Sequence, residues 1–232
     1  DIINYYHTFS IKQEFERYHG LWKQEKDDYW KIRYEYWLKG QEVYQDPYRR
    51  LVMGRSPDAL FKAIDLLTEC TRQGMEKADI FLITLGLIEV WKKKDNGLYA
   101  CEFPGYGAGG GHDKTEFHLS TFQENYDNLK SVVELIRKIN KDAKIVFTVS
   151  PVALGKTFTG NDVVIANTES KSLLRTVAGQ VQREEKDVYY FPSFEIANCL
   201  GKATYKETGR HVKEDVVFAI TKVFMQSHSD RK

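Results

Sequence analysis

Four residues of the chain are of types that can take part in nucleophilic catalysis. Gly86, Ser150 and Ser193 each stand within two residues of the end of a short apolar run, and His211 stands just before the last predicted helix. An imidazole that titrates near neutral pH can take a proton from a nucleophilic hydroxyl. A glycine lets the backbone approach a substrate and present N–H groups to an oxyanion. These residue types are consistent with attack by a hydroxyl nucleophile and stabilisation of an oxyanion.

Each of these residues also has a simpler structural interpretation. Gly86 can merely end a strand, Ser150 can belong to a turn before Pro151, and His211 can be a surface residue without a role. If Ser150 does act, it can be an oxyanion donor, a substrate ligand or a replacement nucleophile. The elements that position these residues must decide between the alternatives.

Apolar runs and helix-start signals predict those elements. Ser56 and Pro57 have the types preferred at the N-cap and first position of a helix. Compact β-branched runs predict buried strands, and apolar residues at helical spacing predict helices. The predicted strands are 78–84, 144–149 and 188–191, and the predicted helices are 8–17, 57–75, 120–136, 164–182 and 212–225.

This alternation of helices and strands predicts an α/β fold with a mostly parallel sheet covered on both faces, which is a three-layer α/β/α arrangement. Ligand sites in such sheets lie beyond the carboxyl ends of the strands. Gly86, Ser150 and Ser193 are therefore expected on one rim of the sheet, beyond the carboxyl ends of its strands, within reach of His211. We predict one domain over residues 1–232.

An aromatic-rich addition is expected near the N-terminus. Residues 20–50 carry many tryptophans and tyrosines among charges, and part of the segment alternates like one or two short strands. It is interpreted as an added packing layer or a platform for sugar rings, with base stacking as a further alternative. A hairpin is predicted around Asn96-Gly97.

Composition narrows the class of protein. A net charge of +1 predicts neither nucleic acid nor an anionic membrane as partner. No apolar run reaches the roughly 18 residues of a membrane-spanning helix. Three scattered cysteines favour a reducing compartment, so the cytoplasm is expected. Composition leaves the oligomeric state open.

No metal and no cofactor are expected. The spacing of His112, Asp113 and His118 matches no known metal-site pattern. The glycine run at 105–111 lacks the strand-turn-helix context of a dinucleotide fingerprint.

Several further residues are candidate ligands. Asn167, Ser170 and Lys171 near the start of a predicted helix can bind an anionic or hydroxylated ligand, although such residues are also ordinary helix caps. Glu89 can act as an acid or as a sugar ligand. Glu195 is expected to pair with either His211 or Arg175, and a structural pairing is as consistent with the sequence as a catalytic one.

Short motifs over nearly the whole chain resemble the GSCFA family. The segments that carry the resemblance are Thr84-Leu85-Gly86, Ser150-Pro151-Val152, Asn167 with Ser170-Lys171-Ser172, Phe191-Pro192-Ser193-Phe194-Glu195-Ile196 and Gly209-Arg210-His211. That family is similar to the SGNH/GDSL hydrolases, so the resemblance implies a flavodoxin-like sheet that places a serine, a histidine and oxyanion donors together. It also implies that Arg210, beside the histidine, binds substrate.

The resemblance implies a serine esterase or O-acyltransferase acting on acylated carbohydrate, such as a polysaccharide precursor. The family's Gly-Ser-Cys-Phe-Ala motif, whose serine is the implied nucleophile, is absent from the sequence. We therefore expect the chain to be N-terminally incomplete and inactive alone. Thr208 stands where the family has an aspartate, with Glu207, Asp215 or a backbone carbonyl as substitutes. Ile88 stands where SGNH hydrolases have an asparagine. These departures favour the alternative of a degenerate, non-catalytic binding module.

Overall fold

A computed structural model describes residues 5–34, 40–104 and 111–228 of the 232-residue chain. The chain forms two compact units. The N-terminal unit consists of Asp1–Ile80 and Ile88–Ala143, and the C-terminal unit consists of Phe81–Leu87 and Lys144–Lys232.

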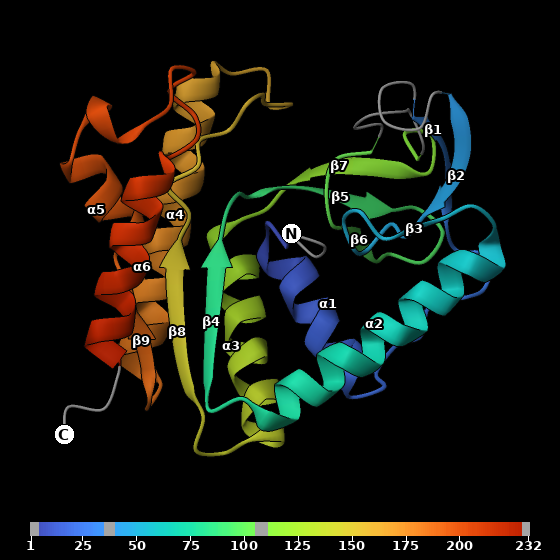
Figure 1. Ribbon diagram of the computed structural model, residues 1–232, viewed down its shortest axis with the longest axis horizontal. Helices are drawn as coiled ribbons and strands as arrows, with labels where there is room; N and C mark the ends of the chain where they lie inside the picture. The colour runs from blue at the N-terminus through green and yellow to red at the C-terminus, as the bar shows by residue number, and fades with distance from the viewer. Residues whose placement is uncertain (1–4, 35–39, 105–110, 229–232) are drawn as a thin grey trace. The chain divides into compact units, whose positions relative to one another are not determined.

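The C-terminal unit contains the predicted parallel sheet. Its strands are β4 (Ile80–Leu85), β8 (Lys144–Val149) and β9 (Val188–Tyr190), with β8 in the centre. β8 and β9 pair in parallel, and Figure 1 shows the arrows of β4 and β8 pointing the same way. Ile145 to Phe147 of β8 are fully buried, as expected for a strand covered on both faces. The predictions of an α/β fold and of these three strands are confirmed.

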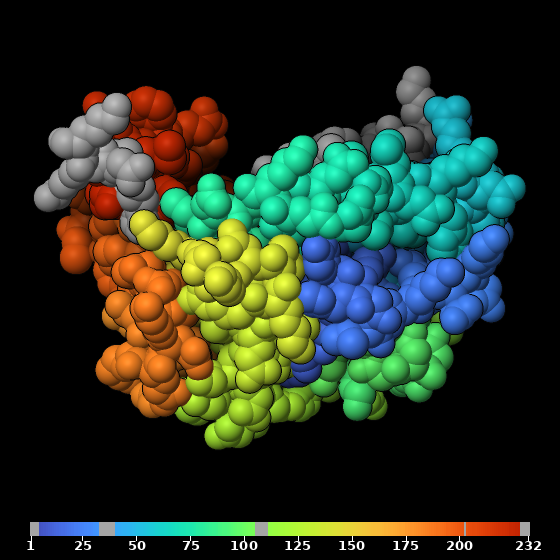
Figure 2. All heavy atoms as spheres, turned by 90° about the horizontal axis from the view of Figure 1, so that it is seen from below, coloured from blue at the N-terminus to red at the C-terminus, as the bar shows by residue number. Residues whose placement is uncertain are grey.

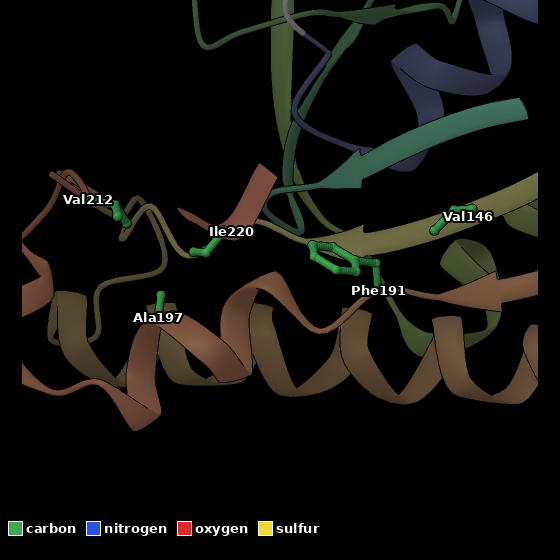
Figure 3. Packing of buried hydrophobic residues seen from close by; sticks show 5 residues of the cluster. All are labelled: Val146, Phe191, Ala197, Val212 and Ile220. Atoms are coloured by element: carbon green, nitrogen blue, oxygen red, sulfur yellow. The ribbon is translucent and has the colours of Figure 1, made fainter. Parts of the chain in front are cut away.

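Helices of this unit pack on the sheet and around one apolar cluster. They are α4 (Val163–Glu184), α5 (Ser193–Cys199) and α6 (Glu214–His228), with a 3-10 turn, η1 (Lys202–Thr204). The cluster joins the sheet to α5 and α6, and Figure 3 shows its buried members: Val146, Phe191, Ala197, Val212 and Ile220.

Two details of this unit differ from the sequence predictions. The last helix begins at Glu214 rather than Val212, because Val212 forms an isolated antiparallel bridge with Tyr205. α5 was not predicted. It is only seven residues long and has no side-chain N-cap, so its sequence lacks the usual start signal.

The described residues of the N-terminal unit form two antiparallel sheets. One has the order β1 (Trp30–Tyr34), β2 (Gln41–Gln45), β3 (Met53–Gly54), and the other has the order β6 (Tyr99–Ala100), β5 (Glu89–Lys93), β7 (Thr115–Leu119). The strands predicted within residues 20–50 and the hairpin at Asn96-Gly97 are confirmed, and Gly97 has the left-handed φ of 72° that a tight turn requires. β7 was not predicted. Residues 105–110 of the glycine run lie outside the described residues.

The described residues of the N-terminal unit also form the helices α1 (Thr8–Tyr18), α2 (Pro57–Lys77) and α3 (Phe122–Ile139). Ser56 caps α2 through Ala59 N–H, and Thr121 and Glu124 form a capping box on α3. Figure 2 shows α1 in blue beside α2 in teal and the end of α3 in yellow. Among the described residues, no helix is both long and apolar enough to cross a bilayer.

Candidate functional site

The carboxyl ends of the three parallel strands meet, as the sheet topology predicts. Ser150 N–H donates to Leu85 O at 2.8 Å, which places the end of β8 against the end of β4. The Ser193 hydroxyl donates to Val149 O at 2.9 Å and lies 2.6 Å from Thr148 Oγ1. Ser193 is buried and its proton is committed to that carbonyl. It therefore joins β8 to the start of α5 rather than offering a donor to a ligand.

Gly86 and Ser150 keep donors available at this rim. Gly86 is half-buried, and its N–H makes no hydrogen bond with any residue that the structure describes. The Ser150 Oγ accepts from Val152 N–H at 3.2 Å, which leaves the hydroxyl proton uncommitted within the described part of the chain. A free backbone N–H and a hydroxyl on adjacent strand ends are the groups that an oxyanion site uses.

Lys171 is the most unusual side chain of the rim. It projects from α4, is only 2% exposed, and its Nζ donates to Gly86 O at 2.6 Å. Burial first and the positive charge of Arg210 second lower the pKa of Lys171 to about 8. The ammonium thus fixes the Gly86 carbonyl while it retains two further N–H groups.

Asn167 and Ser170 lie on α4 close to Lys171. Asn167 is one turn before Lys171, and its Oδ1 accepts from Leu154 N–H at 3.0 Å, so its Nδ2 remains a donor. Ser170 is fully buried, and its Oγ has no hydrogen-bond partner among the described residues.

Arg210 links the segment before α6 to the loop that follows β8. Its Nε donates to Ala153 O at 3.0 Å, and Ala153 N–H returns a bond to Arg210 O at 3.4 Å. A Cβ on Gly155 would lie 3.2 Å from the Arg210 guanidinium carbon, so the glycine permits close packing of that group. Sequence reasoning missed the role of residues 153–155, for which Gly155 was the available signal.

His211 is brought to the same region by this segment. Its backbone carbonyl accepts from Lys206 N–H at 2.8 Å, whereas its side chain is exposed and makes no hydrogen bond or ion pair with any described residue. Thr208 Oγ1 instead lies 3.5 Å from Arg210 N. Neither Glu207 nor Asp215 pairs with the ring, so the described residues provide no carboxylate to orient the imidazole.

Glu195 pairs with Arg175, one of the two partners that the sequence allowed. Its Oε1 accepts from Arg175 Nε at 2.7 Å, and its Oε2 accepts from the Tyr190 hydroxyl at 2.9 Å. Burial, followed by this bond to Glu195, raises the pKa of Tyr190. The Arg175 guanidinium also lies 4.0 Å from the centre of the Tyr190 ring. This carboxylate is therefore committed to a structural cluster at the end of β9.

Glu89 and Ile88 belong to the N-terminal unit. Glu89 is 4% exposed at the start of β5, and Ile88 is 1% exposed, with its carbonyl accepting from Ser120. Between Gly86 and Glu89 the chain passes from β4 to the antiparallel sheet. These two residues therefore belong to different units, although only three positions separate them in sequence. All the other predicted site residues belong to the C-terminal unit.

Two further observations concern ligands. The described residues contain no group of three or more His, Cys, Asp or Glu side chains placed to hold a metal, and His118 instead bonds Glu124 at 2.8 Å. A shallow hollow of about 450 Å³ on α4 is lined by Val164, Ile165, Thr168 and Glu169. None of these four is a predicted site residue, and a single helix supplies them all.

The motifs at this rim can be compared with known protein families. The sequence model of the GSCFA family matches residues 1–224. The chain belongs to the GSCFA family. Curated proteins give no match. The matched range therefore includes both units of this GSCFA protein and each motif at the rim.

Proposed function

We propose that this GSCFA protein is the scaffold of an SGNH-type ester hydrolase or O-acyltransferase acting on acylated carbohydrate. The observation that carries the proposal is the meeting of the β4 and β8 ends with the segment that bears His211. It supports an SGNH-like, flavodoxin-like three-layer fold, because such folds place their chemistry at this edge of the sheet.

In the proposed reaction, His211 is the general base and later the general acid. It takes a proton from a serine hydroxyl as that oxygen attacks the acyl carbon, and it returns the proton to the departing sugar oxygen. Gly86 N–H and the Ser150 hydroxyl stabilise the oxyanion. The serine is contributed by a Gly-Ser-Cys-Phe-Ala segment that is not among these 232 residues, so this stretch alone is inert.

The second candidate is a catalytically degenerate carbohydrate-binding module on the same scaffold. One observation favours it: within the described residues His211 has no carboxylate partner, and Glu195 is already held by Arg175 and Tyr190. Removing the carboxylate partner of a catalytic histidine costs orders of magnitude in rate.

Acyl release from an acetylated oligosaccharide separates the two candidates. The assay uses a protein in which the family's Gly-Ser-Cys-Phe-Ala segment precedes residue 1. An enzyme releases acetate, and His211→Ala lowers the rate by about a thousandfold or more. His112→Ala, which changes an exposed histidine of the N-terminal unit, is the matched control and keeps full activity. Sugar binding without acetate release supports the binding module, and full activity of His211→Ala overturns the histidine assignment.

The compartment is a further part of the proposal. Cys70, Cys101 and Cys199 are all free thiols, and two of them are exposed. Exposed free thiols persist in a reducing compartment, which supports a cytoplasmic protein. Mass spectrometry of the protein isolated with its thiols blocked is the check, since an intact disulfide would contradict the proposal.

A further inference from the structure

Lys171 and Arg210 are two cations with no carboxylate partner among the residues that the structure describes. Lys171 is 2% exposed and bonds a backbone carbonyl, Gly86 O. Arg210 likewise bonds a backbone carbonyl, Ala153 O. A buried ammonium is costly unless a counter-charge or a full set of hydrogen bonds compensates it. Lys171 therefore lacks the anion that its burial calls for, and the exposed Arg210 beside it adds a second unpaired positive charge within the described residues.

The two cations and Asn167 are gathered around one short loop. Asn167 holds Leu154 N–H, and the Arg210 guanidinium bonds Ala153 and packs on Gly155. Lys171 follows Asn167 by four residues on α4, so both side chains project from one side of that helix. Residues 153–155 thus lie between α4 and the segment that ends in Arg210.

The free side-chain groups of Lys171, Asn167 and Arg210 are all donors. Lys171 has two N–H groups left, Asn167 has its Nδ2, and Arg210 has both terminal nitrogens, because none of these makes a hydrogen bond within the described part of the chain. Ammonium and guanidinium groups accept no hydrogen bonds, and the one acceptor of Asn167 is already used. A sugar hydroxyl both donates and accepts hydrogen bonds, whereas a carboxylate or phosphate oxygen only accepts, so a cluster of charged donors is best matched by an anionic oxygen group.

We propose that Lys171, Arg210 and Asn167 form a subsite for an anionic oxygen group, a carboxylate or a phosphate, on the ligand of this rim. Such groups form charge-assisted hydrogen bonds with ammonium and guanidinium donors. The inference rests on the proposed function and narrows it: the acylated carbohydrate is acidic, carrying either a uronic acid or a phosphate. The subsite lies next to Gly86, so the anchored charge orients the neutral part of the ligand toward the oxyanion donors.

The test is a titration of residues 1–232 with three small probes, in which the amide NMR signals of Leu154 and Gly155 are monitored. The probes are inorganic phosphate, glucuronate and, as the uncharged control, glucose. Phosphate or glucuronate is expected to saturate these shifts with a Kd of about 1 mM, and glucose is expected to leave them unchanged. Binding by phosphate alone indicates a phosphorylated ligand, and binding by glucuronate alone indicates a uronic acid.

Variants establish whether the two cations are responsible. Lys171→Met keeps the length of the side chain without its charge, and Arg210→Gln changes an exposed residue. Each is expected to weaken binding at least about tenfold, which corresponds to about 1.4 kcal/mol. Lys186→Met is the matched control, because Lys186 belongs to the same unit and its side chain is 93% exposed. If Lys171→Met does not fold, Arg210→Gln carries the comparison.

Three results would overturn the subsite: no saturable shift with either anion, unchanged binding in Arg210→Gln, or an equal loss in Lys186→Met. The outcome is independent of the acetate-release assay. Anion binding without acetate release leaves the subsite in place on a binding module. Acetate release from a neutral substrate without anion binding leaves the enzyme in place and removes the subsite.

Discussion

Acidification is expected to destabilise the N-terminal unit through one buried histidine, His7. This residue is 2% exposed and caps α1, with Nδ1 accepting from Ser10 N–H at 3.1 Å and Nε2 donating to Ala100 O at 2.9 Å. The two bonds assign the neutral tautomer with its proton on Nε2. Burial lowers the pKa of His7 from 6.5 to about 4, against a smaller opposite effect of the bond to Ala100.

The magnitude follows from the difference between the folded and unfolded states. The unfolded chain takes up the proton near pH 6.5, while the folded chain resists it until about pH 4. The free energy of unfolding is therefore at its full value above about pH 6.5 and falls as the pH is lowered through this window. At about 1.4 kcal/mol per pH unit, the loss is about 3 kcal/mol.

Urea unfolding at pH 7 and at pH 4, monitored by tryptophan fluorescence, measures this loss. All four tryptophans lie between residues 22 and 91, so the signal reports the N-terminal unit. His7→Asn keeps an N-cap acceptor and cannot titrate, so wild type should lose about 3 kcal/mol more than this variant between the two conditions. His112→Asn, at an exposed position, should behave as wild type.

An equal pH dependence in His7→Asn and wild type would refute this reasoning. A direct NMR titration of the His7 ring tests the same linkage if the variant does not fold. A measured pKa near 6.5 would show that burial costs the imidazolium nothing, and a pKa near 4 would support the linkage.

Two other predictions concern the N-terminal unit, the first a buried ion pair and the second the space around two glycines. Arg49→Ala removes the buried partner of Glu14 and strands its carboxylate, so urea unfolding should show a loss of about 3–5 kcal/mol, with a loss below about 1 kcal/mol contradicting the buried pair. Gly54→Ala would place a Cβ 2.3 Å from Leu60 N and should lower the thermal midpoint sharply. Gly74→Ala, with nothing within 4 Å of the new Cβ in an exposed turn of α2, should instead add up to about 1 kcal/mol, and equal effects of the two alanines would contradict the geometry.

Local chemistry predicted the helices and the parallel sheet well. Ser56-Pro57 starts α2 as expected, and α3 begins within two residues of its predicted start, because a helix start needs only residues within one turn. β8 was located at its observed ends because a buried parallel strand is a continuous apolar run. The rule that parallel strands end at one edge then brought Gly86, Ser150 and Ser193 together without knowledge of any contact.

Elements that depend on distant partners were not predictable in the same way. β7 pairs with β5 from residues more than twenty positions away, and its own sequence, Thr-Glu-Phe-His-Leu, is only five residues long, which is too short for periodicity alone to identify a strand. Val212 has the apolar character of a helix residue, yet its bridge to Tyr205 excludes it from α6. In both places a hydrogen-bond partner outside the local window decided the conformation.

The sequence by itself determined the family, the order of the main elements and the edge at which the rim residues meet, since these follow from local periodicity and from motifs of a few residues. Only the tertiary structure decided what each rim residue does. It paired Glu195 with Arg175, assigned Glu89 and Gly86 to different units, and buried Lys171 on a carbonyl beside Arg210 with no carboxylate partner among the described residues. Burial and the choice of ion-pair partner depend on which segments pack together, and no short stretch of sequence contains that information.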